Sequence, residues 1–350
     1  MTTEEHVLEK LELWRRKPPK FRDERITMAH GAGGKATQML VEGLLAPALG
    51  LTELADAAVV EDLALTTDSF VVKPIRFPGG SIGELSVNGT VNDLAVSGAR
   101  PLALTLSLVL EEGLGADDLR AEVEAIAAAA AAAGVSVVGG DTKVVERGRC
   151  DSMYICTTGL GRIDGRAKLS PTALRPGDRI LVSGSIGEHG MAIMLARGEF
   201  ELAAEVLSDT QPLWPAVDAL LEAVGPSLRC VRDATRGGIA SVLNELARTS
   251  GVSVVVREAD VPVKPAVVGA CEILGIDPMY VANEGRLVAF VAPEAADAAF
   301  AALAAAPGCE GASEIGVVRA DPPGLVLVET AFGGRRVMDM LVGDPLPRIC

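Results

Sequence analysis

Strand-like and helix-like segments alternate along this 350-residue chain, in two sets separated by one proline-containing linker. Residues 63–72 alternate in polarity and are rich in β-branched side chains, which is typical of a strand, whereas residues 82–97 carry apolar side chains at helical spacing. The linker, residues 169–178, has two prolines and a turn signal. The alternation predicts a mixed α/β (α+β) protein, and the length favours two domains because a domain typically has about 150 residues.

The period of the apolar residues places the expected elements. In the first set we expect helices at 35–49, 82–97 and 116–133, and strands at 63–72, 102–110, 135–138, 143–146 and 153–159. In the second set we expect strands at 179–183, 252–256, 286–291, 314–318 and 325–329, and helices at 188–197, 214–224, 236–249, 265–274 and 294–305. The predicted divisions are an N-terminal arm with a glycine-rich segment at 1–40, a first domain at 41–165, a second domain at 166–332 and a flexible tail at 333–350.

The composition argues against several classes of function. The net charge is −15 and aromatic residues make up 3%, so the chain lacks the positive charge and the stacking side chains that favour nucleic acids or anionic membranes. Three histidines, and six cysteines without a Cys-x-x-Cys pair, do not favour a structural zinc site. The charged N-terminus has no apolar core, and no uncharged apolar run approaches the roughly 18 residues of a membrane span. We therefore expect a cytoplasmic protein with reduced thiols.

The segment Gly31-Ala-Gly-Gly-Lys-Ala-Thr37 is glycine-rich and leads into an expected helix. It is not a Walker P-loop, because Ala29 and Ala36 stand where that motif needs Gly and Ser or Thr. Backbone N–H groups in such a segment can still bind an anion. An ordinary glycine-rich entry into a helix is the equally simple alternative.

Four aspartates interrupt otherwise apolar elements: Asp56, Asp68, Asp93 and Asp141. Asp68 is the clearest of them, because it lies in an alternating strand where a buried carboxylate must be paired or metal-bound. Any one of these residues could be a turn or cap residue. Together they favour a magnesium–nucleotide site, since Mg²⁺ prefers a few hard oxygen ligands together with phosphates and water.

The chain ends in a cysteine, Cys350, behind a Gly333-Gly334 pair and a Pro345-x-Pro347 stiffener. This arrangement would suit insertion of one sulfur atom into a cleft, and an incidental exposed thiol is the alternative. The neighbouring α-carboxylate raises the pKa of the thiol, so a reactive thiolate would need a cation such as Lys143 or Arg348.

Seven motifs together resemble the HypE family of hydrogenase maturation proteins, over residues 30–350. They are His30-Gly-Ala-Gly-Gly-Lys, Thr66-Thr-Asp-Ser-Phe-Val-Val, Gly89-Thr-Val-Asn-Asp-Leu-Ala, Gly139-Gly-Asp-Thr-Lys-Val-Val, Arg232-Asp-Ala-Thr-Arg-Gly-Gly, Ala282-Asn-Glu-Gly and Pro347-Arg-Ile-Cys. The family lies in the superfamily of ATP-using enzymes that includes aminoimidazole ribonucleotide synthetase and selenophosphate synthetase. The resemblance implies a two-domain PurM-like fold whose N-terminal domain pairs its sheet across a homodimer, with Mg-ATP bound between elements of both domains near the dimer interface.

The resemblance also implies roles for individual residues. Asp68, Asp93 and Asp141 would bind Mg²⁺ with ATP, and Asp56 would support them. Further nucleotide contacts would come from Lys35, Gly33, Gly34, Asn92, Gly139, Gly140 and Asp233. Cys350 would carry the substrate group, with Lys143 beside the sulfur and Glu284 as the base.

In this family the terminal cysteine accepts a carbamoyl group from HypF, and ATP drives its dehydration to a thiocyanate. The cyano group then passes to iron held by HypC–HypD. Phosphorylation would make the amide oxygen a leaving group, and a base would remove the N–H protons. Two alternatives stay open: a synthetase of the same superfamily acting on a free small molecule, and a nucleotide-dependent scaffold for a metal-centre assembly complex.

Overall fold

The computed structural model describes residues 20–51, 54–198, 205–341, 343 and 348–350. By its internal contacts the chain divides into two units. Unit 1 contains the described residues up to Leu54 together with Leu341 and Gly343, and unit 2 contains Ala55–Met340 with Arg348–Cys350. The predicted proline stiffener at 345–347 lies outside the described residues. Among the described helices, none is long and apolar enough to cross a membrane.

Unit 1 holds the glycine-rich segment and the expected helix at 35–49. A 3₁₀ turn, η1 (Met28–Gly31), precedes α2 (Lys35–Leu40), a π-helical turn, η2 (Val41–Leu45), and α3 (Ala46–Leu49). Gly50 ends the helix with φ +70°, a left-handed conformation that glycine adopts without steric cost. The helix predicted at this position is therefore confirmed, with a π-turn in its middle.

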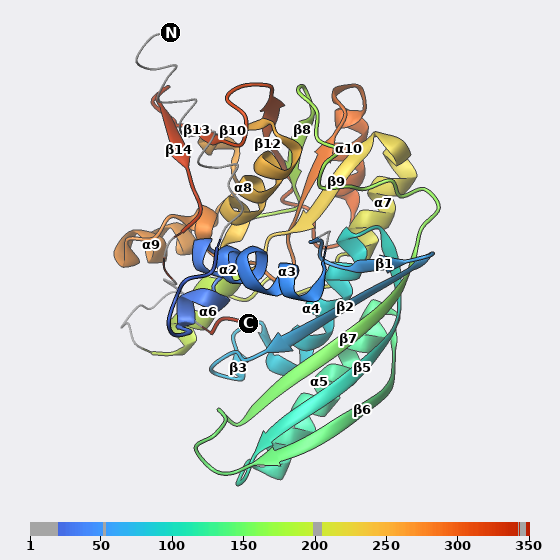
Figure 1. Cartoon of the computed structure of the whole chain (residues 1–350), viewed down its shortest axis with the longest axis vertical. Helices are drawn as coiled ribbons and strands as arrows, with labels where there is room; N and C mark the ends of the chain where they lie inside the picture. Colours follow the sequence, from blue (N-terminus) through green and yellow to red (C-terminus); the bar gives the residue numbers. More distant parts are fainter. Residues whose placement is uncertain (1–19, 52–53, 199–204, 342, 344–347) are drawn as a thin grey trace. The chain divides into compact units, whose positions relative to one another are not determined.

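The first part of unit 2 is a five-stranded sheet with helices on one face. The strand order is β1-β2-β7-β5-β6, with β5 and β6 parallel and the other neighbours antiparallel. Helices α4 (Ile82–Val96) and α5 (Ala116–Ala133) pack together on this sheet (Figure 1). The strands are β1 (Ala58–Val60), β2 (Leu63–Phe70), β5 (Ala99–Glu111), β6 (Ser136–Val145) and β7 (Met153–Ile163), and a two-stranded hairpin, β3 (Arg76–Phe77) with β4 (Gly80–Ser81), precedes α4.

The second part of unit 2 is a seven-stranded sheet in the order β14-β13-β10-β12-β8-β11-β9. Its strands are β8 (Arg179–Val182), β9 (Leu228–Asp233), β10 (Ser253–Arg257), β11 (Leu287–Val291), β12 (Ser313–Arg319), β13 (Val326–Glu329) and β14 (Arg335–Met338). Helix α8 (Gly238–Ser250) packs on this sheet in one hydrophobic core. Helices α7 (Trp214–Val224) and α10 (Ala296–Ala305) pack on the sheet in a second hydrophobic core. Helices α6 (Glu188–Ala196) and α9 (Pro265–Leu274) pack against each other.

Helix α4 joins the two parts of unit 2. It packs against β2 and β7 of the first sheet and against β9 and α7 of the second part. Its apolar residues are therefore buried on every side rather than along one stripe, and polar Asn92 is also buried. The Asn92 amide donates to the Gln211 carbonyl at 3.0 Å and accepts from the Leu213 N–H at 2.7 Å. These bonds fix α4 to the segment that precedes α7.

Three differences from the expected elements concern strands. The strands expected at 135–138 and 143–146 are one strand, β6, because Gly139 and Gly140 continue the pairing with β5 across a bulge. Strand β9 was not predicted, since its two arginines hide the apolar pattern that β strands usually show. Strand β14 pairs with β13, so this part of the segment predicted as a flexible tail is an edge strand.

Candidate active site

Four aspartates from separate segments meet in unit 2. Asp56 precedes β1, Asp93 is on α4 and Asp233 ends β9, and one carboxylate oxygen of each lies within 4.8 Å of the others. Asp68 of β2 joins them, because it is hydrogen-bonded with Asp93. We call these four residues the carboxylate cluster.

Local structure explains why these side chains converge. Strand β2 alternates as predicted, so Thr66 and Asp68 share one face, and the Thr66 hydroxyl donates to Asp93 Oδ2 at 2.6 Å. Tight packing brings α4 close to the sheet, since a Cβ at Gly159 of β7 would lie 2.9 Å from Thr90 and 3.0 Å from Leu94. Asp233 is opposite Leu287 at the start of β11, which places the end of β9 beside the segment that carries Glu284.

The cluster holds more negative charge than its surroundings balance. Burial, together with the charges of Asp68, Asp233 and Asp56, raises the pKa of Asp93 well above its usual value. Burial raises the pKa of Asp233 to about 8. Burial also raises the pKa of Asp56, although Arg232 Nε is 2.7 Å from its carboxylate. Three converging carboxylate oxygens with unfavourable ionisation are a donor set that fits Mg²⁺, because a divalent cation would offset this charge.

The C-terminus of the chain is docked beside this cluster. Cys350 is buried, and its thiol is hydrogen-bonded with the Glu284 side chain. Burial raises the pKa of the thiol to about 12; Arg236 opposes this rise, and Glu284 and Asp68 add to it. The docked thiol is therefore protonated, and this position suits a cysteine that already carries a group rather than a free nucleophile.

Glu284 is held by its backbone, and one oxygen of its carboxyl has no partner. Its N–H donates to Asp209 Oδ1 at 3.1 Å, and its carbonyl accepts from Asn92 Nδ2 at 3.2 Å. The Gln211 amide donates to the Gly285 carbonyl at 2.9 Å. Glu284 Oε1 is buried without a hydrogen-bond partner, and burial raises the pKa of this carboxyl well above its usual value. Burial therefore favours the protonated carboxyl, and the nearby charge of Arg236 favours the ionised form that a general base requires.

Asp141 and Lys143 lie elsewhere on the same chain. Both are on β6, at the opposite edge of the five-stranded sheet from β1, and Lys143 Nζ is 2.6 Å from Asp141 Oδ2. Asp141 is in register with Ser107, Cys156 and Ser69, whereas Asp68 is in register with Thr157. Successive residues of a strand face opposite sides, so Asp141 and Asp68 belong to opposite faces of the sheet. Within the described part of one chain, the residues that lie close to Asp93 are therefore Asp56 and Asp233 and not Asp141. Lys143 does not lie beside the Cys350 sulfur.

The remaining nucleotide-binding candidates fall in different places. Asn92 adjoins the site through its bond to Glu284, and Gly139 and Gly140 are on β6. Gly33, Gly34 and Lys35 belong to unit 1, where the Lys35 N–H donates to the Leu341 carbonyl at 2.9 Å. A Cβ at Gly34 would lie 2.6 Å from the same oxygen, so this segment needs glycine for its contact with the chain near the C-terminus.

Sequence reasoning missed several residues around the sulfur. The cation that acts on Cys350 is Arg236, not Lys143 or Arg348, and Arg348 forms an ion pair with Asp151 instead. The sequence could have pointed to Arg236, since it lies three residues after Asp233 in the motif Arg232-Asp-Ala-Thr-Arg-Gly-Gly. No motif around His189 on α6 pointed to a role at the site, although His189 Nε2 is 2.6 Å from the Ile349 carbonyl oxygen.

Comparison with known proteins supports the same family. Residues 54–163 match the family model "AIR synthase related protein, N-terminal domain", and residues 175–328 match its C-terminal domain. The carbamoyl dehydratase HypE of Rhodobacter capsulatus is 48% identical over 339 residues, which are 94% of this chain and 99% of that protein. The predicted PurM-like fold of two α/β domains is thereby confirmed.

Solved structures agree with the sequence matches. A crystal structure of a HypE–HypF complex has a TM-score of 0.83 and 42% identity, covering 86% of this chain and 99% of that one. A structure of HypE in complex with ATP has a TM-score of 0.79 and 44% identity, covering 93% and 100% of the two chains. The chain belongs to the HypE family of carbamoyl dehydratases, within the AIR synthase related proteins.

Proposed function

We propose that this protein uses ATP to dehydrate a carbamoyl group carried on its own Cys350, giving a thiocyanate. The observation that carries this proposal is the docked C-terminus, which buries the sulfur against Glu284 and beside the carboxylate cluster. The similar HypE structure that holds ATP supports the use of a nucleotide. The product would supply the cyanide ligand of the iron centre of a [NiFe]-hydrogenase.

The reaction requires loss of the amide oxygen and of two protons. Phosphoryl transfer from ATP to the amide oxygen forms a C–O–P linkage and releases ADP. The C–O bond then breaks with the oxygen leaving in phosphate, and the nitrogen, losing both its protons, becomes the nitrile nitrogen. The Glu284 carboxylate would accept a proton from this nitrogen, because the Glu284 side chain lies beside the sulfur that carries the group.

The carboxylate cluster would hold Mg²⁺ with ATP. Asp56, Asp93 and Asp233 supply the converging oxygens, and Asp68 is hydrogen-bonded with Asp93. When bound, the ion supplies positive charge to the phosphates. Arg236 adds positive charge near the sulfur. The roles of Gly33, Gly34, Lys35, Asn92, Gly139 and Gly140 as nucleotide contacts stay predictions.

Asp141 and Lys143 would enter a site only through a homodimer formed by the first sheet. Two apolar side chains on the same face of this sheet as Asp141 are exposed: Val60 is 58% exposed and Leu65 is 41% exposed. Exposed apolar side chains on a sheet face are typical of an interface. A partner chain on this sheet would bring its own Asp141 and Lys143 to a shared site.

Coexpression of two defective chains tests this arrangement. Lys143→Ala and Glu284→Gln should each abolish dehydration, and their mixture should regain roughly a quarter of wild-type turnover, because random pairing makes about half of the dimers mixed and each of these has one intact site. The measurement is dehydration by the mixed population after native mass spectrometry has fixed the fraction of mixed dimers. No recovery in confirmed mixed dimers would place Lys143 in the site of its own chain.

Two partners follow from the proposed reaction. HypF would donate the carbamoyl group, and the HypE–HypF complex among the similar structures supports this assignment. HypC–HypD would accept the cyano group on iron. Both transfers require the tail to leave its buried position, since a sulfur at 9% residue exposure is not open to a second protein.

Mass measurement of the C-terminal peptide tests the proposed function. With HypF and its carbamoyl donor, the peptide should gain one carbamoyl group, and addition of ATP should then remove one water. Full turnover by Cys350→Ala would favour a synthetase acting on a free small molecule. ATP binding without loss of water from the wild-type peptide would favour a scaffold.

A further inference from the structure

The last three residues of the chain occupy a site built from several elements of unit 2. The Arg348 carbonyl accepts from the Lys73 N–H at 3.3 Å and from Arg197 Nη2 at 2.7 Å. The Ile349 carbonyl accepts from His189 Nε2 at 2.6 Å, and the Ile349 side chain is buried. Both carbonyl groups that precede Cys350 are thus held by donors from outside the tail.

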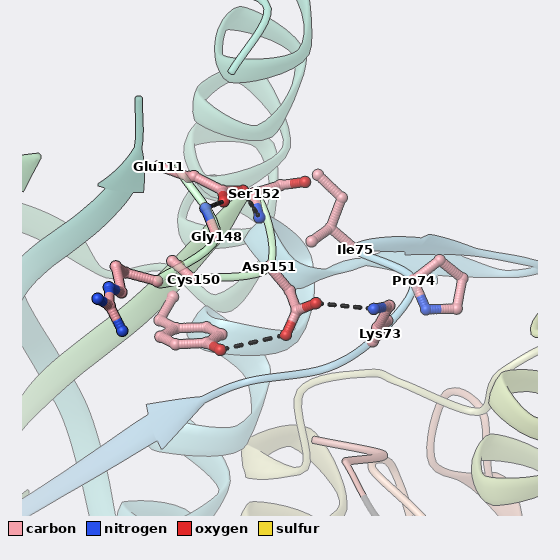
Figure 2. Close-up of a pocket in the computed structure, with 10 residues that line it drawn as sticks. Lys73, Pro74, Ile75, Glu111, Gly148, Cys150, Asp151 and Ser152 are labelled. Carbon is pink, nitrogen blue, oxygen red and sulfur yellow. Dashed lines mark hydrogen bonds and ion pairs between the residues drawn. The ribbon is translucent and has the colours of Figure 1, made fainter. Parts of the chain in front are cut away.

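The Arg348 side chain provides an anchor at the other end of this tripeptide. Its guanidinium forms an ion pair with Asp151, in the turn between β6 and β7. Asp151 also accepts from Lys73 Nζ at 2.7 Å and from the Tyr154 hydroxyl at 3.2 Å (Figure 2). These cations lower the pKa of Asp151 to about 2, so the anchor stays ionised. Arg348 has φ +57°, an uncommon conformation for a residue with a side chain, which its contacts on both sides hold in place.

His189 stands between this anchor and the sulfur, and its hydrogen bonds fix one tautomer. The Ile349 carbonyl can only accept, so Nε2 must carry the proton. Burial lowers the pKa of His189 to about 4, so the ring is neutral and Nδ1 must accept. The Ser208 hydroxyl, 2.8 Å away, donates to Nδ1, and Ser208 Oγ accepts from the Thr210 N–H at 3.2 Å.

The ring of His189 is also held by packing. Phe77 contacts it edge to face, with ring centroids 5.5 Å apart and planes at 89°. The imidazole therefore has a fixed plane, a fixed tautomer and one acceptor at its Nε2 end. This acceptor is the carbonyl directly before the residue that carries the sulfur.

We propose that His189, oriented by Ser208, is a positioning residue that fixes the Ile349 carbonyl and thereby places the Cys350 sulfur beside Glu284 for dehydration. The inference rests on the proposed function, since it concerns the same sulfur. His189 touches the peptide backbone and not the reacting group, so it acts through the position of the tail. Carbamoylation by HypF, which needs the tail outside, should not depend on it.

Two substitutions at His189 separate positioning from packing. Gln keeps a side-chain N–H donor at a similar reach, whereas Leu fills the space without a donor. His189→Leu should slow ATP-dependent dehydration of carbamoylated Cys350 by at least about tenfold, the usual effect of losing a buried hydrogen bond, and His189→Gln should stay within about threefold of wild type. Ser208→Ala should lie between them, because it frees the ring to change tautomer.

A second readout follows docking directly and does not depend on dehydration. A maleimide should alkylate Cys350 of the uncarbamoylated His189→Leu variant about tenfold faster than in wild type, because the buried thiol leaves its site more often. Peptide mass identifies the modified cysteine, since Cys156 is half-exposed and will also react. Asn244→Leu is the matched control: Asn244 is a buried polar side chain whose bonds go to Ala240 and Met338, not to the last three residues.

The outcomes separate this inference from the proposed function. Wild-type dehydration and wild-type thiol protection in His189→Leu would overturn the positioning role. Equal losses in His189→Gln, His189→Leu and Asn244→Leu would also overturn it, because the effect would then follow stability alone. If the wild-type peptide never loses water, the proposed function fails, and faster alkylation in His189→Leu alone would still show that His189 docks the tail.

Discussion

Glu284→Gln will leave the carbamoyl group on Cys350 and stop its dehydration. The substitution preserves the shape of the side chain and the backbone bonds to Asp209 and Asn92. It removes the oxygen that would accept a proton from the substrate nitrogen, so dehydration should fall by at least about a hundredfold, as is usual when a general base is lost. The measurement is loss of water from the carbamoylated C-terminal peptide after ATP is added.

A matched control exists for this change. Glu122 is another buried glutamate, and its carboxylate accepts from Arg76 Nε at 2.8 Å and from the Gly83 N–H at 3.0 Å. Glu122→Gln should lower stability and leave the dehydration rate per folded molecule close to wild type. Dehydration by Glu284→Gln at the wild-type rate would remove Glu284 from the role of base.

Asp93→Asn will abolish ATP-dependent turnover and leave carbamoylation by HypF intact. Asn can still accept from the Thr66 hydroxyl, so the packing of α4 on β2 is preserved. The lost carboxylate is one of the three that converge within 4.8 Å, and ATP hydrolysis should fall by at least about a hundredfold because the charge on the phosphates would no longer be offset. Loss of both activities would instead indicate misfolding.

The same cluster predicts a dependence of stability on pH and Mg²⁺. Burial raises the pKa of Asp233 to about 8, so between about pH 4 and pH 8 the folded protein holds a proton that the unfolded chain has released. The unfolded state then binds fewer protons, and stability without divalent cations should fall as the pH rises from about 6 to 8.5. Mg²⁺ with ATP should reverse this trend, since it binds the ionised carboxylates.

Thermal melting with and without Mg-ATP measures this effect. The increase in melting temperature caused by Mg-ATP should be larger at about pH 8 than at about pH 6, because fewer protons must then be displaced from the cluster. Without Mg-ATP, the melting temperature of Asp233→Asn should depend less on pH than that of the wild type. Mg-ATP should raise the melting temperature of this variant only a little. An equal gain at both pH values in the wild type would contradict the cation site.

Much of the fold could be predicted from periodicity. The helix expected at 116–133 is α5 over the same residues, and the alternation of 63–72 correctly placed Asp68 on a strand. Strand β9 could not be found in this way. Arg229 and Arg232 interrupt its pattern, and only the tertiary structure shows that Arg232 is half-buried as the ion-pair partner of Asp56.

Of the four aspartates that the sequence singled out, the structure brings three together and separates the fourth. Asp56, Asp68 and Asp93 belong to one cluster, as the carboxylates in apolar elements suggested. Asp141 looked equivalent in sequence, but the register of β6 puts it on the opposite face of the sheet. A carboxylate in an apolar strand predicts a partner or a metal ion for that carboxylate. The strand order and register decide which residues lie next to it.

By itself the sequence determined the two α/β domains, the acidic character of the site and the terminal cysteine as its distinctive residue. Only the tertiary structure decided that Arg236 acts on the sulfur, that Arg348 is paired with Asp151 and that His189 holds the Ile349 carbonyl. The physical reason is that hydrophobic periodicity is a local property of the chain. The hydrogen bonds around Cys350 join residues far apart in the sequence, 160 positions for His189 with Ile349 and 151 for Arg197 with Arg348, which only folding brings together.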